Sequence, residues 1–196
     1  YWRYKIAEWN GSDWTTIKDD LEGSGVKTLV TDSSGNLFAG GSFSFEKDRD
    51  KIIKWNGSEW MDVGLWDNGD IRLMTVDLTD SIYVLNDSFN ISVWNKEEWQ
   101  KPSGRGFNNP VLSLVVDASG ILYAGGGFSK YNDEPLNCVA MFDSDKWTSI
   151  GEPSNCTASR LLLDEDGNLY AVKQDENTNY YYIAMWNGTV WNSLPE

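Results

Sequence analysis

The stretch LVTDSSGNLFAGGSF (residues 29–43) recurs along the chain and decides the fold class. The other copies are MTVDLTDSIYVLNDSF (74–89), LVVDASGILYAGGGF (114–128) and LLLDEDGNLYAV (161–172). In each copy an Asp precedes an apolar residue by five positions, as Asp32 precedes Leu37. Short runs rich in β-branched and aromatic residues flank a turn of Asp, Ser and Gly, which is typical of a β-hairpin.

A second phrase alternates with the first and reads WNGSEW at 55–60. Its copies pair an aromatic residue with a Trp five positions later: Trp9 with Trp14, Trp55 with Trp60, Trp94 with Trp99, Phe142 with Trp147, and Trp186 with Trp191. Asn-Gly favours a hairpin, because both residues tolerate the positive φ of a type I′ turn. Whether the loop has two or four residues, the paired aromatic residues project from one face. We interpret them as packing residues between sheets.

The alternation of the two phrases predicts the architecture. The first aromatic residues recur at intervals of 39 to 48 residues, in the range of propeller blades. No stretch shows a convincing helical period. We predict an all-β, four-bladed β-propeller of four-stranded antiparallel blades, at about 26–63, 71–100, 111–150 and 159–194. A linear stack is the alternative; large side chains in outer strands and Gly or Ala in inner strands favour the ring.

The second phrase occurs once more than the first, which leaves an additional N-terminal hairpin at 1–17 before a propeller at 18–196. Three explanations stay open for this half blade. The chain is cut from a longer array, the hairpin caps its own ring, or it pairs with a neighbouring copy. The third follows from the marginal stability and the exposed edge of a solitary hairpin.

Composition narrows the classes of function. The net charge of −14 argues against nucleic-acid partners and anionic membranes, and no run approaches the ~18 apolar residues of a membrane span. With no His, typical zinc sites and His-based triads are excluded, and we expect neither metal nor cofactor. The acidic stretch at 164–168 is interpreted as a turn rather than a calcium loop. Cys138 and Cys156 predict one disulfide, with two separate buried thiols as the alternative.

Glycosylation sequons indicate the compartment. Six N-x-S/T motifs occur, at Asn10, Asn56, Asn86, Asn90, Asn155 and Asn187. Together with the expected disulfide they predict a secreted or cell-surface glycoprotein. The sequence begins at Tyr1 without Met or a leader segment, so we expect any signal peptide to have been removed or left out.

The two alternating phrases resemble the kelch-like propeller repeats of secreted and cell-surface proteins, including fungal cortical-marker proteins. The resemblance covers essentially the whole chain and implies a binding or architectural module. We expect a non-enzymatic structural protein that self-associates, or joins neighbouring modules, into a fibre or surface array through the N-terminal hairpin. The alternative is a lectin-like or protein-binding propeller that uses the loops at 44–51, 129–135 and 173–180, with Trp66, Tyr131, Tyr180 and Tyr181 as stacking residues. An enzyme is least favoured, because no nucleophile–base spacing is visible.

Overall fold

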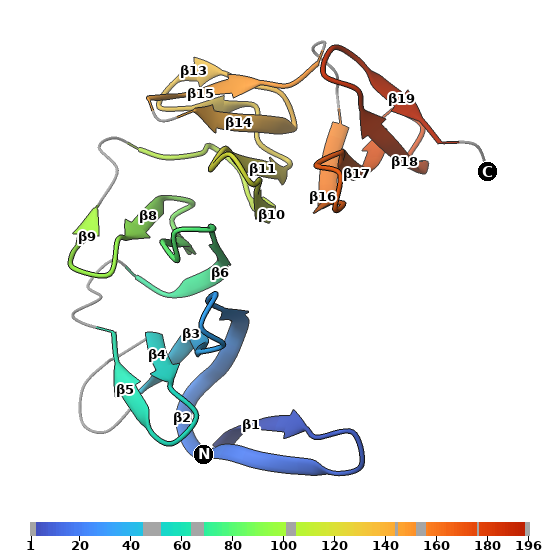
Figure 1. Ribbon diagram of the computed structural model, residues 1–196. Helices are drawn as coiled ribbons and strands as arrows, with labels where there is room; N and C mark the ends of the chain where they lie inside the picture. Colours follow the sequence, from blue (N-terminus) through green and yellow to red (C-terminus); the bar gives the residue numbers. More distant parts are fainter. Residues whose placement is uncertain are drawn as a thin grey trace. The chain divides into compact units, whose positions relative to one another are not determined.

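The computed structural model describes residues 3–44, 52–63, 69–100, 105–143, 145–151, 156–175 and 177–194, and these residues form strands and turns but no helix. The strands pair antiparallel into four main sheets and one small ladder, drawn in Figure 1. The chain divides into two compact units, Tyr1–Met74 and Thr75–Glu196. The prediction of an all-β chain of antiparallel hairpins is confirmed.

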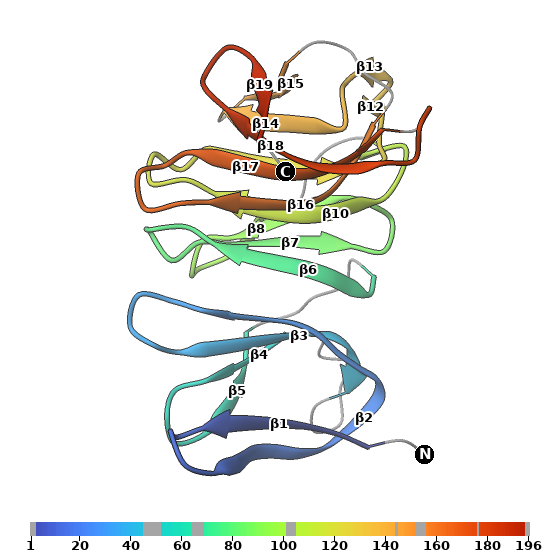
Figure 2. The ribbon, with the colours of Figure 1, turned by 90° about the vertical axis from the view of Figure 1, so that its right-hand side faces the viewer.

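Sheet 1, in the first unit, has the order β1-β2-β3-β4-β5. Its strands are β1 (Arg3–Trp9), β2 (Trp14–Thr31), β3 (Leu37–Ser44), β4 (Ile52–Trp55) and β5 (Trp60–Asp62). β2 pairs with β1 through its first half and with β3 through its second, and Figure 2 shows it as one long ribbon. The predicted hairpin and the first four-stranded sheet therefore share a strand, while the domain boundary at residue 17 stays a prediction.

Glycine residues let β2 change partners. The register shifts between Gly23 and Gly25, which have φ of +134° and +102°. A Cβ on Gly23 would collide with the Ser42 carbonyl, and one on Gly25 would lie 2.6 Å from the Tyr4 ring. A β-bulge at this point bends the strand, and only glycine adopts such a backbone without strain.

The remaining main sheets each contain two consecutive hairpins. Sheet 2 contains β6 (Ile71–Val76), β7 (Ile82–Asn86), β8 (Ile91–Trp94) and β9 (Trp99–Gln100); sheet 3 contains β10 (Val111–Val116), β11 (Leu122–Gly126), β14 (Val139–Asp143) and β15 (Lys146–Ser149); and sheet 4 contains β16 (Cys156–Leu163), β17 (Leu169–Asp175), β18 (Tyr181–Trp186) and β19 (Trp191–Ser193). The boundary between the two units falls within β6. Between β11 and β14 the chain forms a small ladder of β12 (Lys130–Tyr131) and β13 (Glu134–Pro135).

The Asp of the first phrase organises the turn between the first two strands of each repeat. Asp117 Oδ1 accepts hydrogen bonds from the backbone N–H groups of Ser119 and Ile121, at 2.8 and 3.0 Å. The same pattern occurs at Asp32, Asp77 and Asp164. At Asp164 the Asn168 side chain also donates to Oδ2 at 2.9 Å, and this bond contributes most to lowering the pKa of that carboxyl. The acidic stretch at 164–168 is thus a turn held by its own backbone.

The structure gives the length of the Asn-Gly loops, which the sequence left open at two or four residues. Trp55 pairs directly with Trp60, so four residues form the loop. Gly57 has φ of +96°, whereas Asn56 is not among the residues with positive φ. Instead, Asn56 Oδ1 accepts hydrogen bonds from the N–H groups of Ser58 and Glu59, both at 2.9 Å. The loops that begin at Asn10, Asn95 and Asn187 use their Asn side chains in the same way. The amide side chain thus closes the four-residue loop in place of the second left-handed residue that a type I′ turn would need.

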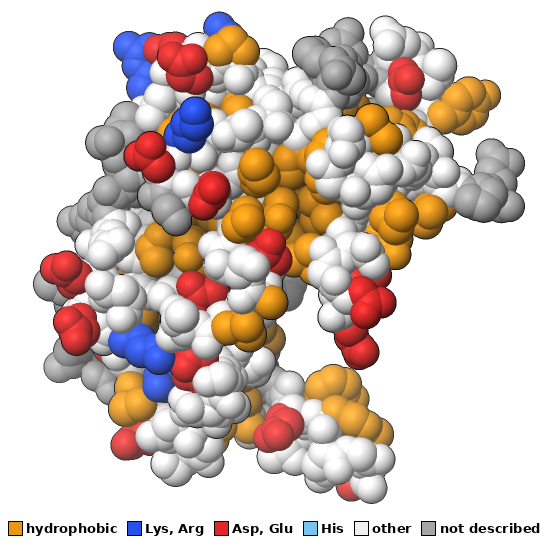
Figure 3. Space-filling view, turned by 45° about the horizontal axis from the view of Figure 1, so that its top comes forward, with side chains coloured by type: hydrophobic (Ala, Val, Ile, Leu, Met, Phe, Trp, Pro, Cys, Tyr) orange, Lys and Arg blue, Asp and Glu red, His pale blue; other side chains and the backbone are white. Residues whose placement is uncertain are grey.

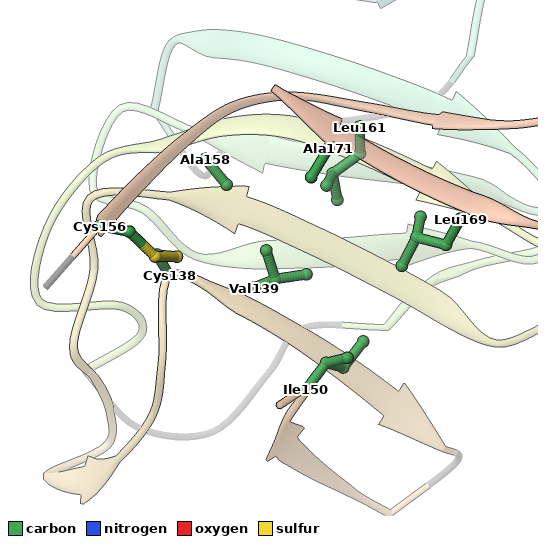
Figure 4. Packing of buried hydrophobic residues seen from close by; sticks show 8 residues of the cluster. All are labelled: Cys138, Val139, Ile150, Cys156, Ala158, Leu161, Leu169 and Ala171. Carbon is green, nitrogen blue, oxygen red and sulfur yellow. A yellow bond between two sulfur atoms is a disulfide. The ribbon is translucent and has the colours of Figure 1, made fainter. Parts of the chain in front are cut away.

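Each unit contains a hydrophobic cluster between neighbouring layers. In the first unit, Ile6 and Leu21 of the hairpin strands cluster with Ile53 of β4. In the second unit, sheets 3 and 4 enclose a cluster that includes Val139, Leu161 and Leu169, shown in Figure 4. A disulfide between Cys138 and Cys156, whose Cα atoms lie 5.8 Å apart, closes this cluster at one end. Cys156 begins β16, so the bond ties sheet 4 to sheet 3.

Candidate functional site

One hydrogen bond recurs where a hairpin packs on the layer that precedes it. Trp60 Nε1 donates to the carbonyl of Ile17 at 2.8 Å, and Trp191 Nε1 donates to the carbonyl of Ile150 at 3.1 Å. Ile17 and Ile150 occupy the same place in the repeat, three residues after the second Trp of the preceding hairpin. Each contact therefore joins a donor Trp on one layer to an acceptor carbonyl on the layer before it.

A second hydrogen bond recurs between the inner strands, and again its acceptor lies on the earlier layer. Thr28 Oγ1 accepts from the N–H of Met74 at 3.2 Å in the first unit. Ser113 Oγ accepts from the N–H of Leu161 at 3.0 Å in the second. Thr28 and Ser113 both lie four residues before a turn Asp, so the hydroxyl is part of the repeat. In all four of these hydrogen bonds the acceptor lies on the earlier layer and the donor on the later one.

The N-terminal hairpin has a face that corresponds to those carrying the donor side chains Trp60 and Trp191, and this face is exposed. Trp9 and Trp14 have 51% and 70% of their surface exposed, although their ring centroids lie 5.6 Å apart, much as in the other pairs. The other aromatic pairs are half-buried. Leu29 of the same unit is 48% exposed, whereas Leu161, at the equivalent position, is 6% exposed. Leu29 lies in the part of β2 that pairs with β3, in the layer after the hairpin, so we call only Trp9 and Trp14 the donor face.

Sheet 4 has an exposed face that carries the equivalents of the accepting residues. Leu194 N donates to the carbonyl of Ile183 at 2.8 Å, as Ile150 N donates to that of Val139 at 3.0 Å, so Leu194 and Ile150 are equivalent. Ile183 and Leu194 are 49% and 40% exposed, whereas Val139 and Ile150 are 0% and 4% exposed. Leu162, 63% exposed, belongs to the same face through the register Leu162–Tyr170–Met185. We call Leu162, Ile183 and Leu194 the acceptor face. Hydrophobic side chains also reach the surface in separate patches in Figure 3.

A groove of about 750 Å³ lies within the second unit, between the β12–β13 ladder and the β14–β15 hairpin. Its lining includes Tyr131, Glu134, Phe142, Asp145, Lys146 and Trp147. Tyr131 was one of the stacking residues expected from the sequence. Tyr180 and Tyr181 are 77% and 64% exposed but do not line this groove. Trp66 lies outside the described residues.

The sequons differ in accessibility. Asn10, Asn56 and Asn187 are exposed at the hairpin loops, Asn90 is half-buried, and Asn155 lies outside the described residues. Asn86 is only 2% exposed, and its Oδ1 accepts from the N–H groups of Ser88 and Asn90. The structure removes Asn86 from the candidate glycan sites, because its amide is buried and holds a turn.

The loop expected at 173–180 is shorter than the sequence suggested. β17 continues to Asp175, and Lys173 is buried within it at 5% exposure. Burial lowers the pKa of Lys173, and its Nζ lies 4.9 Å from the centroid of the Trp191 ring. The ammonium group therefore packs on an aromatic face instead of belonging to a variable loop.

Tyrosine hydroxyls pair with the Asp side chains of the turns. The hydroxyl of Tyr123 donates to Asp117 Oδ2 at 2.9 Å, and burial with this bond raises the pKa of Tyr123 to about 12. Within the described part of the chain, no group of three or more Asp, Glu, Cys or His side chains is arranged to hold a metal ion. No helix capable of spanning a membrane is found among the same residues.

Comparison with solved structures identifies the fold of this chain. The sequence matches no protein-family model and no curated protein. Similar solved structures include virginiamycin B lyase from Staphylococcus aureus, with a TM-score of 0.59 and 10% identity over 99% of this chain and 59% of that one. YCF48 bound to D1 peptide has a TM-score of 0.56 and 15% identity over 91% and 54% of the two chains. The extracellular domain of a putative hybrid two-component system, BT4673 from B. thetaiotaomicron, has a TM-score of 0.60 and 17% identity over 99% and 23%.

These relatives have β-propeller folds, so the predicted propeller is confirmed. The chain spans from about a fifth to three fifths of the length of the similar structures. At these identities the likeness shows the fold alone, and four remains a predicted number of blades. The kelch-like resemblance and the link to fungal cortical-marker proteins also remain expectations.

Proposed function

We propose that this chain is a non-enzymatic, extracellular propeller module that assembles head to tail through its N-terminal hairpin. The observation that carries the proposal is the exposure of Trp9 and Trp14, at a position where Trp60 and Trp191 hydrogen-bond to a preceding layer. Several similar structures are extracellular domains, and the buried disulfide suits an oxidising compartment.

The partner is a second copy of the chain. Leu194 of one copy presents the carbonyl that corresponds to those of Ile17 and Ile150, so Trp14 Nε1 of another copy donates to it. The exposed Ile183, on β18 beside Leu194, then packs on the ring of Trp14. Such a contact buries large aromatic and aliphatic side chains on both sides, as in the centre of a protein interface.

The inner strands contribute less to this contact. Arg160 stands in sheet 4 where Thr28 and Ser113 supply the accepting hydroxyl, and it is exposed. Arginine has no acceptor, so the inner hydrogen bond cannot be repeated between copies. The assembly therefore relies on outer strands, which are the strands that the N-terminal hairpin contains.

N-linked glycans complete the proposal, at Asn10, Asn56, Asn90, Asn155 and Asn187. The exposed loops at 10–13, 56–59 and 187–190 leave room for sugars at hairpin ends. Mass spectrometry of native material before and after enzymatic deglycosylation measures their occupancy. Native protein without any glycan would contradict this part of the proposal.

The assembly is tested by complementary variants. Sedimentation velocity at increasing concentration should show oligomers of the unmodified chain. Trp14→Ala on the donor face and Leu194→Asp on the acceptor face should each reduce them to monomer. Their mixture should form dimers, because each variant keeps the face that the other has lost. Leu78→Asp, at a turn residue that is 74% exposed and belongs to neither face, is the matched control.

Two outcomes would refute the proposal. One is a chain that stays monomeric at every concentration. The other is a mixture of Trp14→Ala and Leu194→Asp that forms no dimer although each variant is folded. Negative-stain electron microscopy of native material then distinguishes fibres with a regular repeat from isolated particles.

A further inference from the structure

The groove in the second unit is built on a fixed aromatic base. The ring of Phe107 lies 4.6 Å from that of Phe128, 5.0 Å from that of Tyr131 and 4.9 Å from that of Trp147, measured between centroids. Phe107 and Phe128 are 3% and 2% exposed. Tyr131 and Trp147 are half-buried and line the groove. Two buried rings therefore support two rings that remain accessible.

Side-chain amides hold the wall formed by β12 and β13. Asn108 Oδ1 accepts from the N–H groups of Ser129 and Lys130, both at 2.9 Å. Asn132 Oδ1 accepts from the N–H groups of Arg105 and Gly106, at 2.6 and 3.0 Å. These bonds connect the ladder to the segment that precedes β10. The wall is consequently ordered before any ligand arrives, which lowers the entropic cost of binding.

The opposite wall carries polar groups of both charges. Asp145 and Lys146 lie at the β14–β15 turn, and Glu134 of β13 also lines the groove. All three side chains are exposed. Carboxylates accept hydrogen bonds and the ammonium group donates them, so the groove offers both functions beside its rings.

The geometry points to a neutral oligosaccharide as the ligand of this groove. A pyranose presents an apolar face of C–H groups and a rim of hydroxyls, which both donate and accept. The first matches the faces of Tyr131 and Trp147, and the second matches Glu134, Asp145 and Lys146. The volume lies within the range of ligand sites that combine aromatic lining with a few polar groups. A strongly charged ligand suits the groove less, since its two carboxylates and one ammonium nearly balance.

This site is independent of assembly. No residue of the donor or acceptor face lines the groove. A monomeric chain would therefore not contradict the saccharide site, and a chain that binds no saccharide would not contradict the assembly.

The test is an NMR titration of the intact chain. Cellohexaose, laminarihexaose and mannohexaose serve as neutral probes, and a Lys-Gly-Lys peptide and a hexagalacturonate serve as charged ones. The indole N–H signal of Trp147 is assigned by its loss in Trp147→Phe. At least one neutral probe should shift that signal saturably, while neither charged probe does.

The variant arm uses exposed residues so that folding is retained. Glu134→Gln with Asp145→Asn should weaken the binding of that probe at least about tenfold, since hydrogen bonds to charged groups are the stronger class. Glu97→Gln with Glu98→Gln, in the corresponding loop of sheet 2, should leave it unchanged. The assignment is overturned if no neutral probe shifts the Trp147 signal, if the peptide or the hexagalacturonate is the probe that binds, or if the groove variants bind as tightly as the unmodified chain.

Discussion

Removing the bond between Cys138 and Cys156 should destabilise the second unit by a calculable amount. The two residues are 18 apart in sequence, and closing a loop of that size in the unfolded chain corresponds to about 3 kcal/mol at 25 °C. Both residues are nearly fully buried, at 3% and 6% exposure, and belong to the cluster between sheets 3 and 4. For a unit of this size the loss corresponds to a fall of roughly 10 °C in Tm.

The assay exploits the absence of cysteine from the first unit. Urea unfolding of the Cys138→Ala, Cys156→Ala double variant is followed by hydrogen exchange and mass spectrometry, which reports the two units separately. Protection in β16 and β14 should fall, while protection in β3 and β4 should not. Replacing each sulfur with hydrogen leaves only a small cavity, which should destabilise the unit less than the loss of the disulfide does.

A loss of less than about 1 kcal/mol would refute the reasoning, because the loop-closure value would then be wrong for this chain. An equal loss of protection in both units would refute it differently. It would mean that the effect of the disulfide is not confined to the layers that it joins.

Three further predictions concern the repeat. Trp60→Phe and Trp191→Phe should each lower the free energy of unfolding by about 1 kcal/mol, because each leaves a carbonyl without its indole donor, whereas exposed Trp14→Phe should not; urea unfolding checks all three. Lys96 has φ of +78° where three other copies have Gly. Lys96→Gly should therefore stabilise the chain by up to about 1 kcal/mol in the same unfolding assay, unless the loss of the exposed ion pair with Asp80 offsets the gain. The pKa of Tyr83 and of Tyr123 is raised from 10.0 to about 12, chiefly by burial, so the stability that these neutral hydroxyls contribute is present below pH 10 and lost as pH rises to about 12. Tyrosinate absorbance should show the two late titrations, and Tyr123→Phe should remove one; normal titration of both residues would contradict the prediction.

The repeat predicted most of the strands, because its signals are local. The turn Asp, the loop glycines and the paired aromatic residues each act within about six positions, so their spacing reports the hairpins directly. The same logic predicted the disulfide, which uses the only two cysteines.

Features that depend on distant partners were not predictable in this way. The stretch KDDLEGSG (18–25) looks like an acidic linker, yet it is part of β2 because Leu21 is buried against the hairpin and sheet 1. The ladder of β12 and β13 looks like a variable loop, but Asn132 and Asp133, with φ of +47° and +73°, make the tight turn expected elsewhere for Asn-Gly. The ladder packs over Phe107 and forms the groove because Asn108 Oδ1 accepts hydrogen bonds from Ser129 and Lys130, and no sequence pattern predicts these bonds.

The repeated indole-to-carbonyl bond gives the molecule a direction. Trp60 and Trp191 both belong to the later layer and their acceptors to the earlier one, so both of these contacts point the same way along the chain. An assembly that extends this contact is polar, with two different ends, and no twofold axis can relate two copies joined by it. Its growth can be arrested at one end without affecting the other, and a cell that anchors one end fixes which end remains free to grow.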